Sequence, residues 1–482
     1  MTEKSWKDKI EIFKEILALD PNAIDFSDKE LVKSLFFKYL NVTETLLQEN
    51  LKLKEYVQLL EDEINRLKGE KGMPKIKPNV PNKENNVGGQ IKPKPWKKES
   101  KNNRIKIDRE EYRQVDRNIL PPDAVHKGYR SVTIQNIKLT TDNVRYMLER
   151  FFSPQAGKLY EASLPEGIQG EFGSELKAFI HFLYFKGRVT ENRIHGLLRD
   201  IGITISEGQI SDILTNSNSE AFTKEKQEVF EEGMKHAGYF NIDDTGARHR
   251  GMNNRFHAIS TELFTAFFIM PRKDRETVEH ILDLSGTNWR SKIMISDNAR
   301  QFQGLTKIQA LCWIHEFRHY RKLSPMLEYY KNILHEFLTE AWEYYHQLDE
   351  YRKAPKRRRR KYLEQRFDEL FSRETAYAEL NWRMQQTMGN KDRLLVVLDY
   401  PDIPLHNNSV EIAVREPVVK KNISYGTRSE AGKRVWENML SLSDTCRKLG
   451  ISFYAYLNDR FSGRNEIPLL GKIIAEKAAI CS

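Results

Sequence analysis

The chain has 482 residues, of which 39% are hydrophobic and 30% are charged, and its formal net charge is +10. The length predicts roughly two to four domains, and the composition excludes a wholly disordered chain. The positive charge favours a polyanionic partner, although charge alone does not separate nucleic acid from an anionic membrane surface.

The first residues interleave charged and apolar side chains and lack the core of a signal peptide. No apolar run approaches the roughly 20 residues that span a bilayer. The three cysteines, Cys312, Cys446 and Cys481, form no CxxC pair, which argues against a disulfide framework or a zinc knuckle. We therefore expect a protein of a reducing, intracellular compartment that does not enter a membrane.

The first predicted element is a long helix within an amino-terminal region of residues 1–68. Leucines recur every seven residues from Leu46 to Leu67, and they take heptad position d. The corresponding a positions are Phe36, Thr43, Asn50, Val57 and Ile64. An apolar seam of period 3.5 over about five heptads is typical of a coiled coil, so we predict a dimerising coiled coil. A single amphipathic helix packed on its own core is the alternative.

The next two predicted regions are a linker and a helical region. Residues 69–101 carry nine lysines against three glutamates together with several Pro, Gly and Asn, which predicts a flexible basic linker over residues 69–116. Residues 117–232 are expected to be mostly helical. Two of their helices are joined by a tight turn, and Ser206 with Gln209 predicts a capping box at the second of them. The pattern resembles a DNA-binding helix-turn-helix, with a supporting helical bundle as the alternative.

A different pattern begins near residue 236, where short runs rich in β-branched and aromatic residues predict strands. The predicted strands are 236–243, 255–260, 263–270 and 291–296, with a helix at 274–285. Strand, strand, strand, helix, strand is the opening order of an RNase H-like α/β fold. We therefore predict an RNase H-like catalytic core at 233–465 with a helical insertion at about 316–395, a mainly α-helical region before it, and a tail at 466–482.

Three acidic residues stand out in this predicted core. Asp243 and Asp297 each end a strand-like run, and Glu411 lies in a helix-like segment that two asparagines are expected to cap. Acids at the ends of adjacent strands meet at one edge of a sheet, where ligand sites of α/β folds gather. Two divalent ions about 4 Å apart, held by such carboxylates, can activate an attacking oxygen and stabilise a leaving oxygen. From these residues alone, turns and helix caps explain the acids at least as often.

These blocks resemble the insertion sequence 66 family of DDE transposases (transposase C type) in order and spacing across about residues 235–460. The matching residues are Asp243-Asp244-Thr245, Asp297, Cys312-Trp313-Ile314-His315, Asn407-Asn408-Ser409-Val410-Glu411, Arg415, Lys420-Lys421-Asn422 and Gly426 to Gly432. The chain departs from the family in three ways: no cysteine precedes Cys312, Ile412 stands where an arginine is usual, and Asp244 replaces a glutamate. The first departure argues against a zinc-organised DNA-binding segment after the coiled coil.

The resemblance implies a magnesium- or manganese-dependent enzyme in which Asp243, Asp297 and Glu411 hold two ions. It implies cleavage of DNA at the inverted terminal repeats of a transposon and strand transfer into target DNA. It also implies a prokaryotic, cytoplasmic protein acting at the nucleoid as a homodimer or higher assembly, with accessory proteins of the same element as possible partners. A nuclease of RNase H-like fold that does not join strands, and a domesticated DNA-binding protein without catalysis, are the alternative functions.

Other residues of the matching blocks allow two interpretations of their role. Arg415, Lys420, Lys421 and Arg428 are expected nucleic-acid contacts, with solvated surface as the alternative. Cys312 and His315 have the spacing of half a zinc site, but no second pair lies nearby in sequence, so packing near Asp297 is the favoured role.

Overall fold

The computed structural model describes residues 25–67, 107–116, 118, 120–121, 123–165 and 170–481. The first 24 residues and most of the predicted basic linker, residues 68–106, lie outside the described residues. The chain divides into one unit of residues 75–144 and a second of residues 1–74 with 145–482. The described part of the first unit contains no α-helix or strand, so the account below concerns the second unit. Across the described helices, none combines the length and apolarity needed to cross a membrane.

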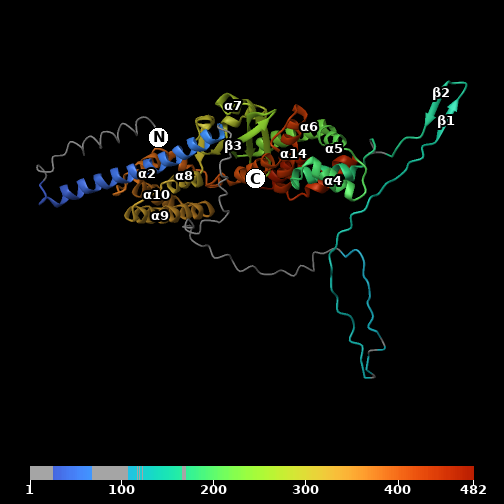
Figure 1. Cartoon of the computed structure of the whole chain (residues 1–482), viewed down its shortest axis with the longest axis horizontal. Coiled ribbons are helices and arrows are strands. Elements are labelled where there is room, and N and C mark those ends of the chain that lie inside the picture. The colour runs from blue at the N-terminus through green and yellow to red at the C-terminus, as the bar shows by residue number, and fades with distance from the viewer. Residues whose placement is uncertain are drawn as a thin grey trace. The chain divides into compact units, whose positions relative to one another are not determined.

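The second unit is a mixed α/β structure around a five-stranded sheet with the order β5-β4-β3-β6-β7 (Figure 1). The strands are β3 (Tyr239–His249), β4 (Met252–Ser260), β5 (Thr265–Met270), β6 (Ile293–Ser296) and β7 (Ile308–Leu311). β3, β4 and β5 are antiparallel neighbours, whereas β6 and β7 run parallel to β3. The four strands expected from the sequence are confirmed. β7 was not expected, because its sequence, IQAL, has a single β-branched residue and no aromatic one.

The strand β3 extends further than the sequence predicts. Asp243 and Asp244 were expected to end it, but it continues to His249 because β4 pairs with it along its whole second half. Arg250 and Gly251 both have positive φ angles, as a tight hairpin turn requires. The parallel pairing of β3 with β6 stops at Asn241, so Asp243 lies where the sheet loses a neighbouring strand rather than where its own strand ends.

Helices cover the sheet and its free edge. They are α3 (Ser174–His181), α4 (Glu191–Asp200), α5 (Glu207–Asn216), α6 (Ser219–His236), α7 (Arg275–Asp283), α13 (Asn408–Ser424), α14 (Glu430–Leu449), α15 (Phe453–Ser462) and α16 (Leu470–Cys481). A π-helical turn, η5 (Phe182–Lys186), continues α3, and short 3-10 turns are η6 (Trp289–Ser291) and η7 (Arg300–Phe302). Side chains of α14 accept hydrogen bonds from the backbone N–H groups of Thr265, Phe267 and Ile269, which satisfies the outer edge of β5.

Two expectations for the regions beside the core need correction. The helical pattern expected from residue 117 holds only from Ser174 onward, since the described residues before it include a hairpin of β1 (Arg150–Ser153) and β2 (Lys158–Glu161). The predicted tail at 466–482 contains α16, in which Leu470 and Ile474 are fully buried. The capping box of α5 at Ser206 and Gln209 is confirmed.

The helices between β7 and α13 build a second hydrophobic core. They are α8 (Trp313–Arg321), α9 (Glu328–Lys353), α10 (Arg357–Phe371), α11 (Ala378–Met388) and α12 (Lys391–Leu394), followed by the 3-10 turn η8 (Val396–Leu398). Trp313 is fully buried, and its indole N–H donates to the carbonyl of Leu394 at 3.0 Å. Residues of β6 and β7 belong to this core, which therefore fixes α8 to the sheet.

The long helix α2 (Lys29–Leu67) packs against this second core (Figure 1). The buried carboxylate of Glu44 accepts hydrogen bonds from the backbone N–H groups of Met326 and Leu327, directly before α9. Asn41 accepts a hydrogen bond from the N–H of Ala378 at the start of α11. Neither α9 nor α11 has a side-chain cap of its own, so α2 satisfies amino-terminal groups of both helices.

Candidate active site

The site begins where β3 and β6 lie side by side. Asn241 pairs with Ile295 in the parallel register, and continuing this register by two residues sets Asp243 opposite Asp297, just after β6. Burial raises the pKa of Asp243 to about 7, and a hydrogen bond from the N–H of Asp244 opposes this shift. The negative charges of Asp297, Asp244 and Glu411 raise the pKa further. The carboxylates are therefore close enough to repel one another.

Glu411 reaches this cluster from the first turn of α13. Its side chain is 13% exposed, and one carboxylate oxygen accepts a 2.5 Å hydrogen bond from the guanidinium of Arg318 on α8. The other oxygen, Oε1, is buried, lies 3.5 Å from Nδ1 of His315, and has no hydrogen-bond partner in the described structure. Sequence reasoning missed Arg318, although its position three residues after His315 sets both side chains on one face of a helix.

Asn407 holds the start of α13 against the sheet. Its side chain is fully buried and donates to the carbonyl of Ile242 at 3.0 Å, and Nδ2 of Asn241 donates to its oxygen at 2.7 Å. Its backbone N–H donates to the sulfur of Cys312 at 3.2 Å. Asn407 stands at the N-cap position of α13 as expected, but its side chain makes no cap hydrogen bond, and Asn408 is not a cap because it is the first helical residue. Asn407 instead joins three elements next to Asp243.

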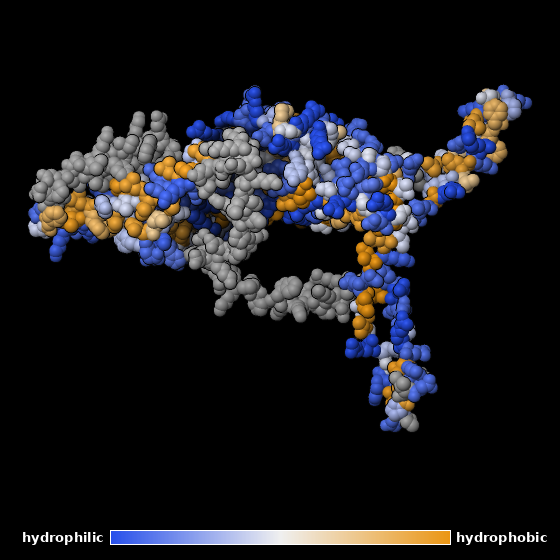
Figure 2. Space-filling model, in the orientation of Figure 1, coloured by the Kyte–Doolittle hydropathy of each residue, from blue (hydrophilic) through white to orange (hydrophobic). Residues whose placement is uncertain are grey.

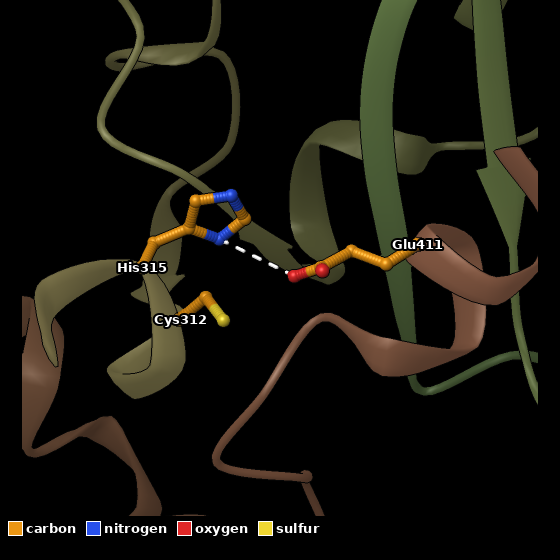
Figure 3. Close-up of side chains that lie close together, drawn as sticks. All are labelled: Cys312, His315 and Glu411. Carbon is orange, nitrogen blue, oxygen red and sulfur yellow. Dashed lines mark ion pairs between the residues drawn. The ribbon is translucent and has the colours of Figure 1, made fainter. Parts of the chain in front are cut away.

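Cys312, His315 and Glu411 form a second arrangement with metal-binding potential (Figure 3). One ligand atom from each of them lies within 4.8 Å of the other two, so Glu411 supplies the third ligand that the sequence spacing lacked. Burial raises the pKa of Cys312 to about 11, which disfavours the thiolate that metal binding needs. The cluster shares Glu411 with the two aspartates, so the two arrangements compete for the same carboxylate.

The acid cluster fits a hard divalent cation. Asp243, Asp297 and Glu411 offer carboxylate oxygens, the ligands that Mg²⁺ prefers. Glu411 Oε1 is buried without a hydrogen-bond partner, and the pKa of Asp243 is raised partly by negative charges that Arg318 does not neutralise. A cation bound among these groups would satisfy the oxygen and remove the repulsion.

Asp244 has a different environment from Asp243. Its carboxylate accepts a hydrogen bond from the Gln301 side chain at 2.8 Å and lies 3.5 Å from the guanidinium of Arg255. Both partners are remote in sequence, and nothing in their local patterns pointed to this role. Asp244 is thus already paired within the protein.

The four expected nucleic-acid contacts lie in different environments. Arg415 and Arg428 are exposed, whereas Lys421 is half-buried and donates to the carbonyl of Gly246 at 3.1 Å. The expectation for Lys420 is wrong, because its side chain is buried and donates to the carbonyl of Tyr184 at 2.7 Å. Its ammonium group also lies 3.2 Å from the centre of the Tyr184 ring, so this lysine supports packing.

Comparison with known proteins identifies a family for the part of the chain that contains the sheet. The family model described as Transposase IS66 family matches residues 169–435, a range that includes all five strands of the sheet, Asp243, Asp297 and Glu411. The uncharacterized protein y4jO of Sinorhizobium fredii (strain NBRC 101917 / NGR234) is 36% identical over 188 residues, which are 39% of this chain. The chain spans 56% of the length of that relative.

Asn407→Ala should release the start of α13 from β3. The change leaves Asn241 and the carbonyl of Ile242 without their buried partners, so we expect unfolding to become easier by about 1–3 kcal/mol. Hydrogen exchange should accelerate at amides 408–412. Asn408→Ala, at the neighbouring position without a buried side-chain bond, is the control. Equal effects of the two changes on exchange and stability would contradict the role given to Asn407.

Asp243→Asn should make the stability of the protein less dependent on pH. Because the pKa of Asp243 is raised above its usual value of 3.8, the folded state binds more protons between about pH 4 and 7 than the unfolded state. Wild-type stability from this group therefore falls as pH rises through that window. In buffer without divalent ions, the melting temperature of the variant should exceed that of the wild type at pH 8. The expected increase is about 2–4 °C for each kcal/mol of unfolding free energy that the variant gains. The difference in melting temperature should vanish near pH 4. A difference that does not change with pH would contradict this assignment.

Proposed function

The chain belongs to the Transposase IS66 family, and from this membership we propose that it is a metal-dependent DNA transposase that cuts strands at transposon ends and joins them to target DNA. The observation that supports the proposal is that the charges of Asp297 and Glu411 act on Asp243, which lies on β3 just beyond the end of its pairing with β6. Transposon end DNA and target DNA are the proposed partners.

The sheet topology supports an RNase H-like core. Three antiparallel strands followed by two strands parallel to the first give the spatial order third, second, first, fourth, fifth. The first aspartate then lies in the first strand, the second follows the fourth strand, and the glutamate lies in a helix packed along the first strand. This arrangement brings acids from three separated segments of sequence to one edge, as phosphoryl transfer with bound cations needs.

The proposed reaction consists of two substitutions at phosphorus. In the first, a water oxygen bonds to the phosphorus and the bond to the 3′ oxygen breaks, which leaves a free 3′-hydroxyl. In the second, that hydroxyl bonds to a phosphorus of target DNA and displaces a target 3′ oxygen. Divalent ions held by Asp243, Asp297 and Glu411 would supply charge neutralisation and an activated oxygen. Arg318 orients the Glu411 carboxylate through its hydrogen bond, and Asn407 sets the position of its helix.

The two alternative functions predict different products. A nuclease of the same fold would cut DNA but would not join a precut 3′ end to a second duplex. A domesticated DNA-binding protein would do neither, and the presence of all three acids argues against it. Strand transfer with a precut oligonucleotide therefore separates a transposase from both alternatives, and cleavage of an uncut end separates the nuclease from the non-catalytic protein.

We also propose that α2 pairs with α2 of a second copy. The side chains that bind α9 and α11, such as Glu44 and Asn41, occupy heptad positions b and f, on the side away from the seam. The seam residues from Leu46 to Leu60 are exposed, and Figure 2 shows apolar surface along α2. They include Leu46, Leu53, Val57 and Leu60, which are 45–62% exposed. Packing on its own chain and pairing with another chain thus use different faces of the helix.

The three acids should be individually required for chemistry. Asp243→Asn, Asp297→Asn and Glu411→Gln keep the shape of each side chain but weaken cation binding. We expect each to reduce cleavage and joining on the order of 10²-fold or more while binding of end DNA stays near wild type. Asp244→Asn and Glu416→Gln are the controls, since Asp244 pairs with Arg255 and Glu416 with Arg188. Cleavage by any one of the three variants at the wild-type rate would refute the assignment.

Leu53→Glu should separate the proposed dimer. The glutamate would set two carboxylates against each other at position d of the seam, and we expect dissociation to monomers in sedimentation of the full chain. Leu51→Glu is the control, because Leu51 is 47% exposed but lies at position b. If both variants assemble as the wild type does, assembly does not use this seam.

A further inference from the structure

A cavity of about 540 Å³ opens along β3 beyond Asp243, between the β3–β4 hairpin and the carboxyl end of α13. Its lining includes Arg248, Asn253, Arg255, Lys421, Asn422 and Tyr425. None of the described lining residues is acidic. Asp243 and Arg248 are five residues apart on β3, a span of about 16 Å that a few nucleotides cover, and their side chains leave opposite faces of the strand.

The cavity has positive charge without a partner. Among the described residues, neither Arg248 nor Lys421 forms an ion pair, and the one polar contact of the Lys421 ammonium group is with the carbonyl of Gly246. Arg255 is the exception, because it pairs with Asp244, next to the first catalytic aspartate. An anionic group could therefore pair with Arg248 and Lys421 without first breaking an ion pair to a protein carboxylate.

Tyr425 presents an aromatic ring to solvent from a rigid backbone. Its side chain is 82% exposed, and its φ angle of 58° is one that residues other than glycine rarely adopt. The next residue, Gly426, has no room for a Cβ, which would lie 2.2 Å from the carbonyl oxygen of Arg248. Thr427 exchanges backbone hydrogen bonds with Arg248 and Arg250, so the loop is tied to the β3–β4 hairpin. The left-handed backbone of Tyr425 is the C-cap that ends α13, and it leaves the ring exposed beside the cavity.

We propose that this cavity binds unpaired nucleotides of a DNA strand whose neighbouring phosphodiester lies at the three acids, with a base stacked on Tyr425 and phosphates beside Arg248 and Lys421. The inference rests on the proposed function and adds that the enzyme recognises single-stranded DNA next to the cleaved bond. Aromatic rings combined with a cationic groove bind single strands with little sequence preference. A paired duplex keeps the faces of its bases inside its own stack, so the exposed ring selects unpaired bases.

The test uses the full chain and a single-stranded oligonucleotide of about ten nucleotides carrying one 5-iodouracil, with EDTA present so that cleavage does not occur. Irradiation followed by peptide mapping should give a crosslink at Tyr425. Arg248→Ala and Tyr425→Leu should each weaken binding about tenfold, whereas Tyr425→Trp, which keeps an aromatic face, should bind like the wild type. Arg464→Ala is the control, because Arg464 is exposed and outside the cavity.

Two comparisons separate this inference from a structural role of Tyr425 and from the proposed function. Tyr425→Gly should weaken binding while leaving the melting temperature unchanged or higher, since glycine relieves the backbone strain. Asp297→Asn should stop cleavage but bind the oligonucleotide like the wild type, so a failure of the catalytic assignment would be seen separately. A crosslink map without Tyr425, wild-type binding by Tyr425→Leu, or an equal loss of duplex binding would overturn the inference.

Discussion

The buried side chains of Asn241 and Asn407 hold β3 against the start of α13, and this contact brings together carboxylates whose negative charges oppose one another. Burial raises the pKa of Asp243, and the charges of Asp297, Asp244 and Glu411 raise it further, so mutual attraction cannot assemble these carboxylates. A neutral contact does it instead. Asn407 binds the strand immediately before Asp243 and also binds Cys312 at the end of β7, while its own helix carries Glu411 one turn later. Since a buried amide must be satisfied, no small shift of α13 along β3 keeps these bonds.

The second core completes this arrangement from the other side. Trp313, the first residue of α8, donates a hydrogen bond to the carbonyl of Leu394 and so fixes the start of this helix. His315 and Arg318, on the same helix, then lie beside Glu411. The guanidinium neutralises part of the charge and leaves one buried carboxylate oxygen open. The helical insertion is therefore part of the site and not only an addition to the sheet. The long helix α2 in turn satisfies the first backbone groups of α9 and α11, which connects a surface proposed for assembly with the core that orients Arg318.

Much of this could be predicted from the sequence, and the failures have physical causes. The strands β3 to β6 were predictable because each is a short run of β-branched and aromatic residues between breaking residues. The full length of β3 was not, since its second half is polar and is extended by pairing with β4. Asn407 has the sequence context of a helix cap. Its role in joining α13 to β3 depends on Asn241, which is distant in sequence and becomes its neighbour only in the folded chain. Lys420 and Lys421 are adjacent and identical in type, yet one is buried against Tyr184 and the other lines a cavity, a difference that helix rotation alone determines. The docking of α2 uses polar b and f positions, which heptad patterns ignore.

The central claim is that the three carboxylates hold divalent cations between them, and anomalous scattering from Mn²⁺ tests it most directly. Crystals of the full chain bound to a precut transposon end, soaked in Mn²⁺, should show anomalous peaks that contact Asp243, Asp297 and Glu411, with two ions separated by about 4 Å. In the same map Oε1 of Glu411, which Arg318 leaves open, should contact one of these ions. Peaks confined to Cys312, His315 and Glu411, with none between the two aspartates, would contradict the account and assign the cation to the cysteine and histidine cluster instead.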